Sequence, residues 1–147
     1  MKVLKPFIGL DEFKLLSSVE QVEKLLKQNG EKYTKEIWPN EELTNPVPWT
    51  VINTASGLSF FFANDKLFKI YVEDNTDYAL ENGIKIGMPL EKAKQIDSKL
   101  SYDDWNEDWA SSQGYWLEDN IETGCIASIT VFIKEVLNDE LFDKYEW

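Results

Sequence analysis

One segment near the N-terminus has apolar residues at the spacing of a helix. Its apolar positions are Val19, Val22, Leu25 and Leu26, and positions three or four residues apart share one face of a helix. Ser18 stands at the start with Gln21 three residues later, which is the pattern of a capping box. Asn29 and Gly30 supply the left-handed residue that commonly ends a helix. The sequence therefore predicts a helix over residues 18–29.

Several runs of β-branched and aromatic residues predict strands. They cover residues 49–54, 58–62, 67–72 and 125–133, while residues 3–10 form either a strand or an extended lead-in. A turn of only four residues joins the runs 58–62 and 67–72, so together they predict a hairpin. The hairpin is apolar enough that at least one of its strands should be central in a sheet.

Residues 31–48 are interrupted by Pro39, Pro46 and Pro48. Proline cannot donate a hydrogen bond to a β-ladder, so this segment is expected to be a loop or an edge strand. Four large apolar residues are expected to anchor it to the core: Ile37, Trp38, Leu43 and Trp49.

The second half follows a polar, acidic stretch at residues 73–82, which is expected to be a linker. A short strand is predicted at residues 84–88, followed by a brief helix with Pro89 at its first position. The narrow apolar stripe of that helix is Leu90, Ala93 and Ile96. Near the C-terminus, Asn138 can cap a last helix. The apolar residues of this helix are Leu141, Phe142 and Tyr145.

The two halves share an order of elements: short strand, helix, hairpin. Duplication, chance and a common α+β arrangement all explain this order. If residues 1–75 and 82–135 are repeats, their hairpins at 58–72 and 115–133 form one continuous antiparallel sheet. The predicted fold is α+β, an antiparallel sheet with helices packed on one face, in a single domain of residues 1–147.

Composition changes this picture mainly through charge. The 147 residues include 15 lysines and no arginine against 27 acidic residues, so the net charge is −12. This charge disfavours nucleic acid and anionic membrane as partners. The absence of histidine removes the commonest general base and metal ligand, and the lone Cys125 cannot form an intrachain disulfide. A signal-peptide pattern and an apolar run of the roughly 20 residues that span a bilayer are both missing, so a soluble cytoplasmic protein is expected.

Residues 101–124 concentrate negative charge and aromatic rings. The segment holds seven carboxylates, five aromatic rings and no lysine. Trp and Tyr among charges are typical of a hot-spot surface that binds a basic partner. A solvated acidic loop whose rings turn inward is the competing interpretation. On the first interpretation, the partner-binding residues are Asp103, Asp104, Trp105, Glu107, Asp108, Trp109, Tyr115, Trp116, Glu118 and Asp119.

The same residues offer little support for catalysis. Paired carboxylates and Trp rings fit a carbohydrate-binding or glycoside-hydrolysing module, but sequence spacing does not show a carboxylate pair at the separation that hydrolysis needs. Asp104, Asn106 and Asp108 alternate as in a calcium-binding EF-hand loop. However, Trp109 stands where that loop needs glycine and Tyr115 where it needs its final acid. The lone cysteine has no histidine to activate it. No catalytic residue, metal site or cofactor is therefore assigned.

Three stretches of the second half resemble the immunity proteins of bacterial contact-dependent inhibition and other polymorphic toxin systems. They are residues 83–88 with the helix after them, residues 114–118 and residues 129–133. The resemblance implies a non-catalytic inhibitor that binds a cognate toxin domain, such as a basic nuclease, and blocks its active site or an adjacent surface. A carbohydrate module and a structural adaptor without a dedicated toxin are the alternative hypotheses.

Overall fold

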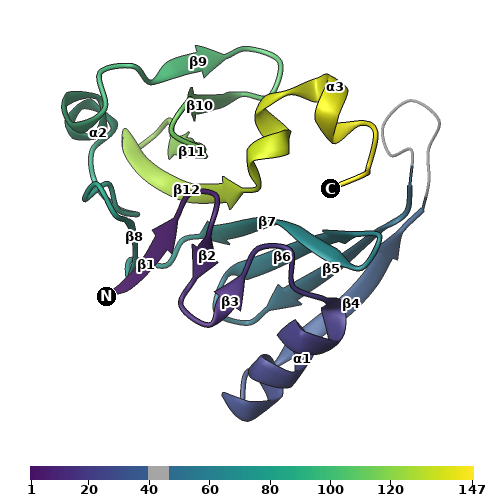
Figure 1. Cartoon of the computed structure of the whole chain (residues 1–147). Helices are drawn as coiled ribbons and strands as arrows, with labels where there is room; N and C mark the ends of the chain where they lie inside the picture. Colours follow the sequence, from purple (N-terminus) through teal and green to yellow (C-terminus); the bar gives the residue numbers. More distant parts are fainter. Residues whose placement is uncertain (40–46) are drawn as a thin grey trace.

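The largest element of the fold is an eight-stranded antiparallel sheet (Figure 1). The computed structural model describes residues 1–39 and 47–147. In spatial order the strands are β4 (Tyr33–Trp38), β5 (Trp49–Thr54), β6 (Leu58–Ala63), β7 (Lys66–Glu73), β12 (Cys125–Phe132), β11 (Tyr115–Asn120), β10 (Asp108–Ser111) and β9 (Ser101–Asp103). The strands predicted at 49–54, 58–62, 67–72 and 125–133 are confirmed, and β6 and β7 are both central.

The β6–β7 hairpin and the β11–β12 hairpin meet in the middle of this sheet. Strand β7 pairs antiparallel with β12, which places Lys69 opposite Phe132 and Tyr71 opposite Thr130. Each half of the chain thus supplies a four-stranded meander, β4–β7 or β9–β12, and the two form the continuous sheet that was expected. Duplication stays one of the three explanations for the order of elements that the halves share.

A smaller sheet is built from the N-terminal strands and one strand of the second half. Its order is β3 (Phe13–Lys14), β2 (Gly9–Leu10), β1 (Lys2–Lys5) and β8 (Tyr78–Leu80), with β1 and β8 parallel. The prediction of a linker at residues 73–82 is wrong at β8, whose three residues are all buried. Three residues are too few to show a periodic pattern, and pairing with the distant N-terminus makes them a strand.

Helix α1 (Val19–Gln28) begins and ends where the sequence predicts. The backbone N–H of Gln21 donates to Ser18 Oγ (3.1 Å), and the backbone N–H of Ser18 donates to Gln21 Oε1 (2.9 Å). These two bonds satisfy N–H groups that the first helical turn leaves free. Gly30 has a φ of +67°, the left-handed conformation that commonly follows a helix.

The second half differs from its prediction in two places. Helix α2 (Leu90–Ile96) has Pro89 at its N-cap and not at its first position. Residues 84–88 form turns and not the predicted strand, with isolated bridges from Lys85 to Ala79 and from Pro89 to Cys125. Both bridging partners come from other elements, so the local composition alone does not determine this conformation.

A 3-10 helix, η1 (Lys134–Leu137), and helix α3 (Asp139–Phe142) end the chain. The side-chain oxygen of Asn138 accepts from the backbone N–H groups of Glu140 (3.0 Å) and Leu141 (3.3 Å), which confirms the predicted cap. Phe142 packs on Phe68 of β7 with ring centroids 5.3 Å apart. Tyr145, predicted within the helix, lies beyond its end.

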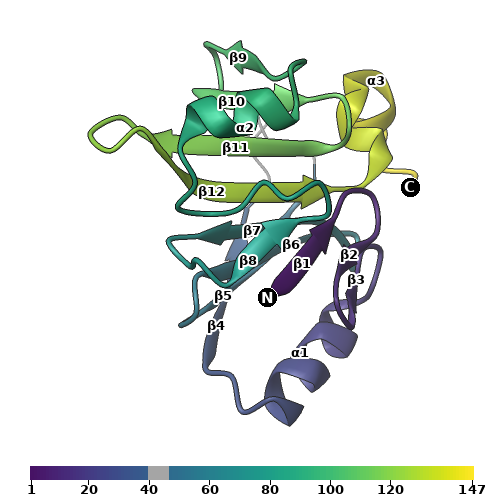
Figure 2. The ribbon, with the colours of Figure 1, turned by 90° about the vertical axis from the view of Figure 1, so that its left-hand side faces the viewer.

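The two faces of the large sheet have different environments (Figures 1 and 2). One face is covered by the smaller sheet, α1 and α2. The main core lies there and includes Leu4, Leu26, Ile52, Phe60, Ile70, Ala93 and Ile129. The opposite face, here termed the open face, is covered at one end by α3 and the C-terminal residues. The predicted α+β fold is confirmed, with α1 and α2 on one face and the short α3 on the other.

The described residues before Pro39 form an edge strand, so the edge-strand alternative is confirmed for this part of the segment. Strand β4 is outermost in the sheet. Trp38 stacks on Trp49 with ring centroids 6.2 Å apart and so attaches this edge to β5. Ile37 is 61% exposed, so its predicted anchoring role is wrong because its side chain faces solvent. Leu43 lies outside the described residues.

Candidate functional site

The acidic and aromatic segment, residues 101–124, forms the strands β9, β10 and β11 and the turns between them. Side chains alternate between the two faces of each strand, and turn residues project beyond the sheet. The ten residues predicted to bind a partner are therefore divided among a turn, the covered face and the open face.

The β9–β10 turn presents a fully exposed indole. Asp103 accepts hydrogen bonds at Oδ1 from the backbone N–H groups of Trp105 (2.9 Å) and Asn106 (3.2 Å). This local bonding tightens the turn, and Trp105 at its tip is 92% exposed. Asp104 and Glu107 are exposed on either side of it. Of the ten predicted residues, these three and Glu118 are exposed.

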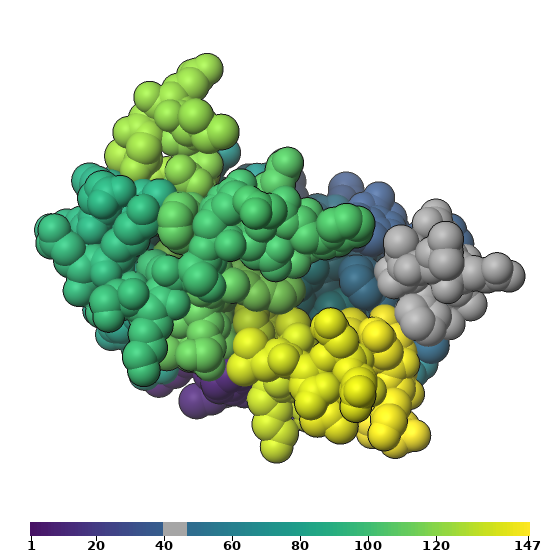
Figure 3. Space-filling model, turned by 90° about the horizontal axis from the view of Figure 1, so that it is seen from above, coloured from purple at the N-terminus to yellow at the C-terminus, as the bar shows by residue number. Residues whose placement is uncertain are grey.

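A second hairpin projects at the same end of the sheet. Because β9 to β12 are consecutive antiparallel strands, the β9–β10 and β11–β12 turns lie at one end (Figure 2). Figure 3 shows the β11–β12 turn extending beyond the rest of the molecule. Ile121 in that turn is 93% exposed, next to the exposed Glu122. The sequence analysis missed Ile121, although an isoleucine within the polar stretch Asp-Asn-Ile-Glu-Thr was a usable signal.

Trp109 faces the covered side of the sheet. Its ring lies 5.2 Å from the ring of Tyr102, and Lys94 Nζ of α2 lies 4.2 Å from a Trp109 ring centroid. These contacts fix the indole between β9 and α2. Trp109 therefore contributes packing between two elements more than contact area for a partner.

Tyr115 is buried, which corrects its prediction as a contact residue. Its hydroxyl donates to Asp97 Oδ2, which also accepts from Ser111 Oγ (2.7 Å). Asn82 Nδ2 donates in turn to the Tyr115 hydroxyl (3.2 Å). Burial and the hydrogen bond to Asp97 raise the pKa of Tyr115 to about 12. The residue belongs to the core because alternation along β11 turns it away from Trp116.

Asp108, Trp116 and Glu118 belong to the open face, where the register joins them to residues of the first half. Trp116 is opposite Thr130, which is opposite Tyr71. The Trp116 ring packs against Phe132 with centroids 4.5 Å apart. Asp119, the last predicted contact, follows a β-bulge and is partly buried.

Lys69 lies at the centre of the open face inside a group of aromatic rings. Its Nζ is 4.2 Å from the ring centroid of Phe61, 5.6 Å from that of Trp49 and 5.9 Å from that of Trp116. No carboxylate of the described residues lies within 4.0 Å of it. Burial lowers the pKa of Lys69 to about 8, although Asp108 and Glu118 favour its charged form. The sequence analysis missed this residue, whose signal was a single lysine within an apolar strand.

Asp108 is the least satisfied polar residue near Lys69. It is only 7% exposed, and its Oδ1 is buried without a hydrogen-bond partner among the residues that the structure describes. Burial, with the carboxylates of Asp103 and Glu118, raises the pKa of Asp108 to about 6, against the opposing effect of Lys69. Glu118 is better satisfied because it accepts from Ser128 Oγ (2.6 Å).

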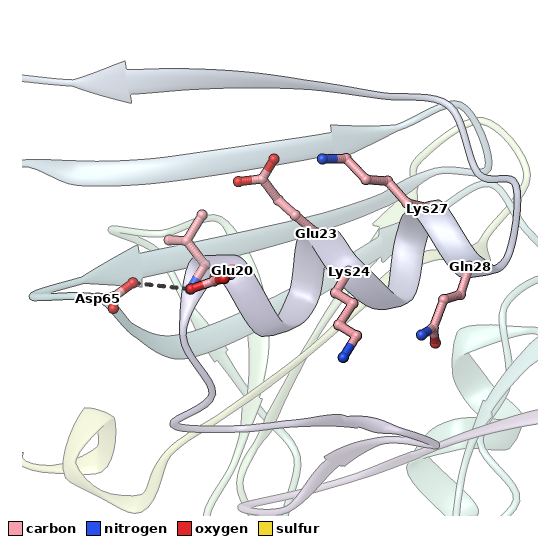
Figure 4. A pocket seen from close by; sticks show the side chains of 7 residues that line it. Glu20, Glu23, Lys24, Lys27, Gln28 and Asp65 are labelled. Carbon is pink, nitrogen blue, oxygen red and sulfur yellow. Dashed lines mark hydrogen bonds between the residues drawn. The ribbon is translucent and has the colours of Figure 1, made fainter.

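A wide groove of about 730 Å³ runs along α1 (Figure 4). Charged residues of both signs line it together with Gln28 and Val19; the charged ones are Glu20, Glu23, Lys24, Lys27 and Asp65. Two of its carboxylates already have partners, because Asp65 accepts from the backbone N–H of Val19 (3.0 Å) and Glu23 pairs with Lys35 (2.9 Å). The groove therefore offers no convergent chemistry.

Two further findings concern the described part of the chain. It contains no group of three or more metal-ligating side chains at binding geometry. None of its helices is long and apolar enough to cross a membrane.

Comparison with known proteins informs the fold. No protein-family model matches the chain, and no curated protein matches it. The chain is similar in structure to the uncharacterized protein yfeY from Escherichia coli, whose crystal structure superposes with a TM-score of 0.60 at 11% sequence identity. The match covers 88% of this chain and 99% of that chain. At this identity the likeness shows a shared fold and no shared function.

Proposed function

We propose that this chain is a non-catalytic immunity protein that binds and neutralises a cognate toxin domain, such as a basic nuclease. The observation that best supports the proposal is Trp105, 92% exposed at the tip of a turn between two exposed carboxylates. A large indole left in water on a hydrogen-bonded turn is typical of an anchor that becomes buried in a complex. The proposed contact surface centres on Asp104, Trp105 and Glu107, with Ile121 on the neighbouring turn.

The distribution of charge supports a basic partner. The net charge is −12, and several acidic residues gather in the turns at this end of the sheet: Asp74, Asp77, Asp104, Glu107 and Glu122. A field of one sign increases the rate at which an oppositely charged protein associates and orients it on approach. A cytoplasmic location and the absence of catalysis are parts of this proposal.

A carbohydrate module has less support from the geometry. The three Trp rings of the segment are directed differently: Trp105 to solvent, Trp109 toward Lys94 and Trp116 against Phe132. They do not present one continuous aromatic platform to a sugar chain. Titration of Trp fluorescence with oligosaccharides is expected to give no response, and a saturable response would favour the carbohydrate alternative.

The deciding experiment combines binding and protection. The partner is isolated on the immobilised chain from the native cells, and its toxic domain is expressed with and without this chain. Trp105→Ala is expected to weaken binding at least about tenfold and to abolish protection, with an unchanged melting temperature because the side chain makes little contact with its own chain. Trp38→Ala, at the opposite edge of the sheet, is the matched control and should leave binding intact.

The electrostatic part of the proposal has its own test. Reversal of charge at Asp104 and Glu107 to Lys should slow association and reduce its dependence on salt, while dissociation changes less. Unchanged affinity of Trp105→Ala, or a partner that does not impair growth, would refute the proposed function.

A further inference from the structure

The open face around Asp108 holds charged groups that lack partners. Asp108 is more than nine-tenths buried, yet its side-chain Oδ1 accepts no hydrogen bond from any described residue. Lys69, across the face, has aromatic rings around its ammonium and no carboxylate within 4.0 Å. Buried polar groups are normally paired, because removing them from water without compensation is unfavourable. Unpaired charges held by a rigid sheet are more typical of a binding site than of a structural core.

The local charge favours a cation as the missing partner. Asp103 and Glu118 are close enough to Asp108 that their negative charges disfavour its ionised form. Lys69 is the cation that opposes this effect. An anionic ligand would meet these carboxylates and be repelled. A metal ion would need three or more ligands at binding geometry, and the described residues offer no such group.

The side chains that neighbour one another at the site favour an organic cation. Asp108 and Glu118 lie on adjacent strands of the open face, and Trp116 is two residues from Glu118 on the same face of β11. A guanidinium donates to carboxylates in a planar fork and stacks on an indole, and an ammonium makes weaker versions of both contacts. The chain contains no arginine, so a guanidinium at this site must come from another molecule.

We propose that Asp108 and Glu118, with Trp116 beside them, bind an arginine or lysine side chain of the protein partner. That the cation comes from a protein partner rests on the proposed function. The existence of the cation site does not depend on it. Cation binding stabilises the charged form of Asp108, so affinity is expected to rise as Asp108 loses its proton. The burial and neighbouring carboxylates that raise the pKa of Asp108 to about 6 place this rise between pH 5 and pH 7.5.

The test uses the isolated full chain and L-argininamide as the probe. Its binding is followed by NMR at low salt, at pH 7.5 and pH 5.0. Saturable shifts are expected at residues 69, 108, 116 and 118, with weaker binding at the lower pH. Asp108→Asn should weaken binding about tenfold or more. The matched control is Asp104→Asn, which removes the same charge from the exposed turn and should change affinity less than about twofold.

Lys69→Met separates a cation site from one for a neutral ligand. Removing the opposing positive charge should tighten argininamide binding, whereas a ligand that needs Lys69 as a donor would be lost. Equal weakening by Asp108→Asn and Asp104→Asn would refute the site, because it would indicate general charge attraction. Much tighter binding of spermidine than of argininamide would refute a partner side chain as the occupant. The argininamide titration contains no protein partner, so a negative result overturns this cation site and leaves the proposed function standing. Failure of the protection assay overturns the proposed function and leaves the cation site standing.

Discussion

The ring of Phe7 lies so close to Gly114 that a Cβ on this glycine would come within 2.5 Å of it. Phe7 lies in the turn between β1 and β2, and Gly114 in the turn between β10 and β11, so the contact connects the smaller sheet to the large one. The Phe7 ring also packs edge-on against Phe132, with centroids 6.5 Å apart. Position 114 needs glycine for space and also for its φ of +103°.

Gly114→Ala is therefore expected to lower the free energy of unfolding by about 2–4 kcal/mol, the sum of a backbone cost and a steric one. Gly83→Ala is the matched control, because Gly83 has a similar φ of +96° and no atom within 4 Å of the added Cβ. Gly83→Ala should lower the free energy of unfolding only by the backbone cost, about 1 kcal/mol. Urea unfolding of both variants measures the difference. Equal losses would show that the Phe7 contact does not matter.

Tyr115→Phe tests the polar network in the core. The change removes the hydroxyl that donates to Asp97 and leaves the carboxylate with fewer donors. A cost of about 1–3 kcal/mol is expected, because the acceptor is buried. Tyr71→Phe is the control, since its hydroxyl donates to the exposed Glu73 (2.9 Å) and its loss should cost less than about 0.5 kcal/mol.

The pH dependence of the stability lost in Tyr115→Phe tests whether the hydrogen bond to Asp97 causes that loss. Burial alone would raise the pKa of Asp97, but the hydrogen bonds from Tyr115 and Ser111, together with the backbone N–H and the charge of Lys99, outweigh burial and lower it. A carboxyl with a lowered folded pKa contributes stability above its unfolded pKa of about 3.9 and loses it as the pH falls further. The deficit of Tyr115→Phe should therefore shrink below about pH 4. A deficit of constant size down to pH 2.5 would contradict this explanation.

Local signals in the sequence predicted the parts of the fold that local interactions form. The capping pattern of Ser18 and Gln21 predicted the start of α1, because both bonds are made within one turn. The short turn before Lys66 likewise predicted the β6–β7 hairpin. By contrast, β8 depends on pairing with β1 at the N-terminus, and residues 84–88 depend on hydrogen bonds to β8 and to β12. Three to five residues carry too little pattern to reveal either arrangement.

In the candidate site too, features set by nearby residues could be predicted from the sequence and features set by strand pairing could not. Trp105 could be predicted because charged and turn-forming residues surround it. Asp108 was predicted for its charge, but its lack of partners depends on the pairing of several strands. Lys69 was missed because its ring contacts come from β5, β6 and β11, which only the register of the whole sheet brings together. Tyr115 was assigned wrongly because the predicted hairpin at 115–133 begins at this residue but does not show which face of β11 packs against the core.

Asp108→Asn is expected to stabilise the protein at neutral pH. Burial, with Asp103 and Glu118, raises the pKa of Asp108 to about 6. The folded protein therefore binds a proton more tightly than the unfolded chain, and stability falls as the pH rises from about 4 to about 6. The neutral amide avoids this loss without removing an accepted hydrogen bond, so a gain of about 1–2 kcal/mol is expected at pH 7.5. Unfolding at pH 4, 5, 6 and 7.5 should show the gain only above pH 4. Asp104→Asn, an exposed change of the same kind, should show none.

Lys69→Met is expected to stabilise the protein at pH 7, because burial lowers the pKa of Lys69 to about 8 while Asp108 and Glu118 only partly compensate. An unfolded lysine has a pKa near 10.4, so the unfolded chain binds more protons between about pH 8 and pH 10. The charge of this lysine therefore destabilises the protein at pH 7, and this destabilisation disappears as the pH rises from about 8 to about 10. Methionine keeps the packing against Phe61 and removes the charge, with an expected gain of about 1–2 kcal/mol at pH 7 that narrows toward pH 10. Lys92→Met, on the exposed side of α2, should change stability by less than about 0.5 kcal/mol. A loss of stability in Lys69→Met at pH 7 would mean that the ring contacts of the ammonium outweigh its cost of burial.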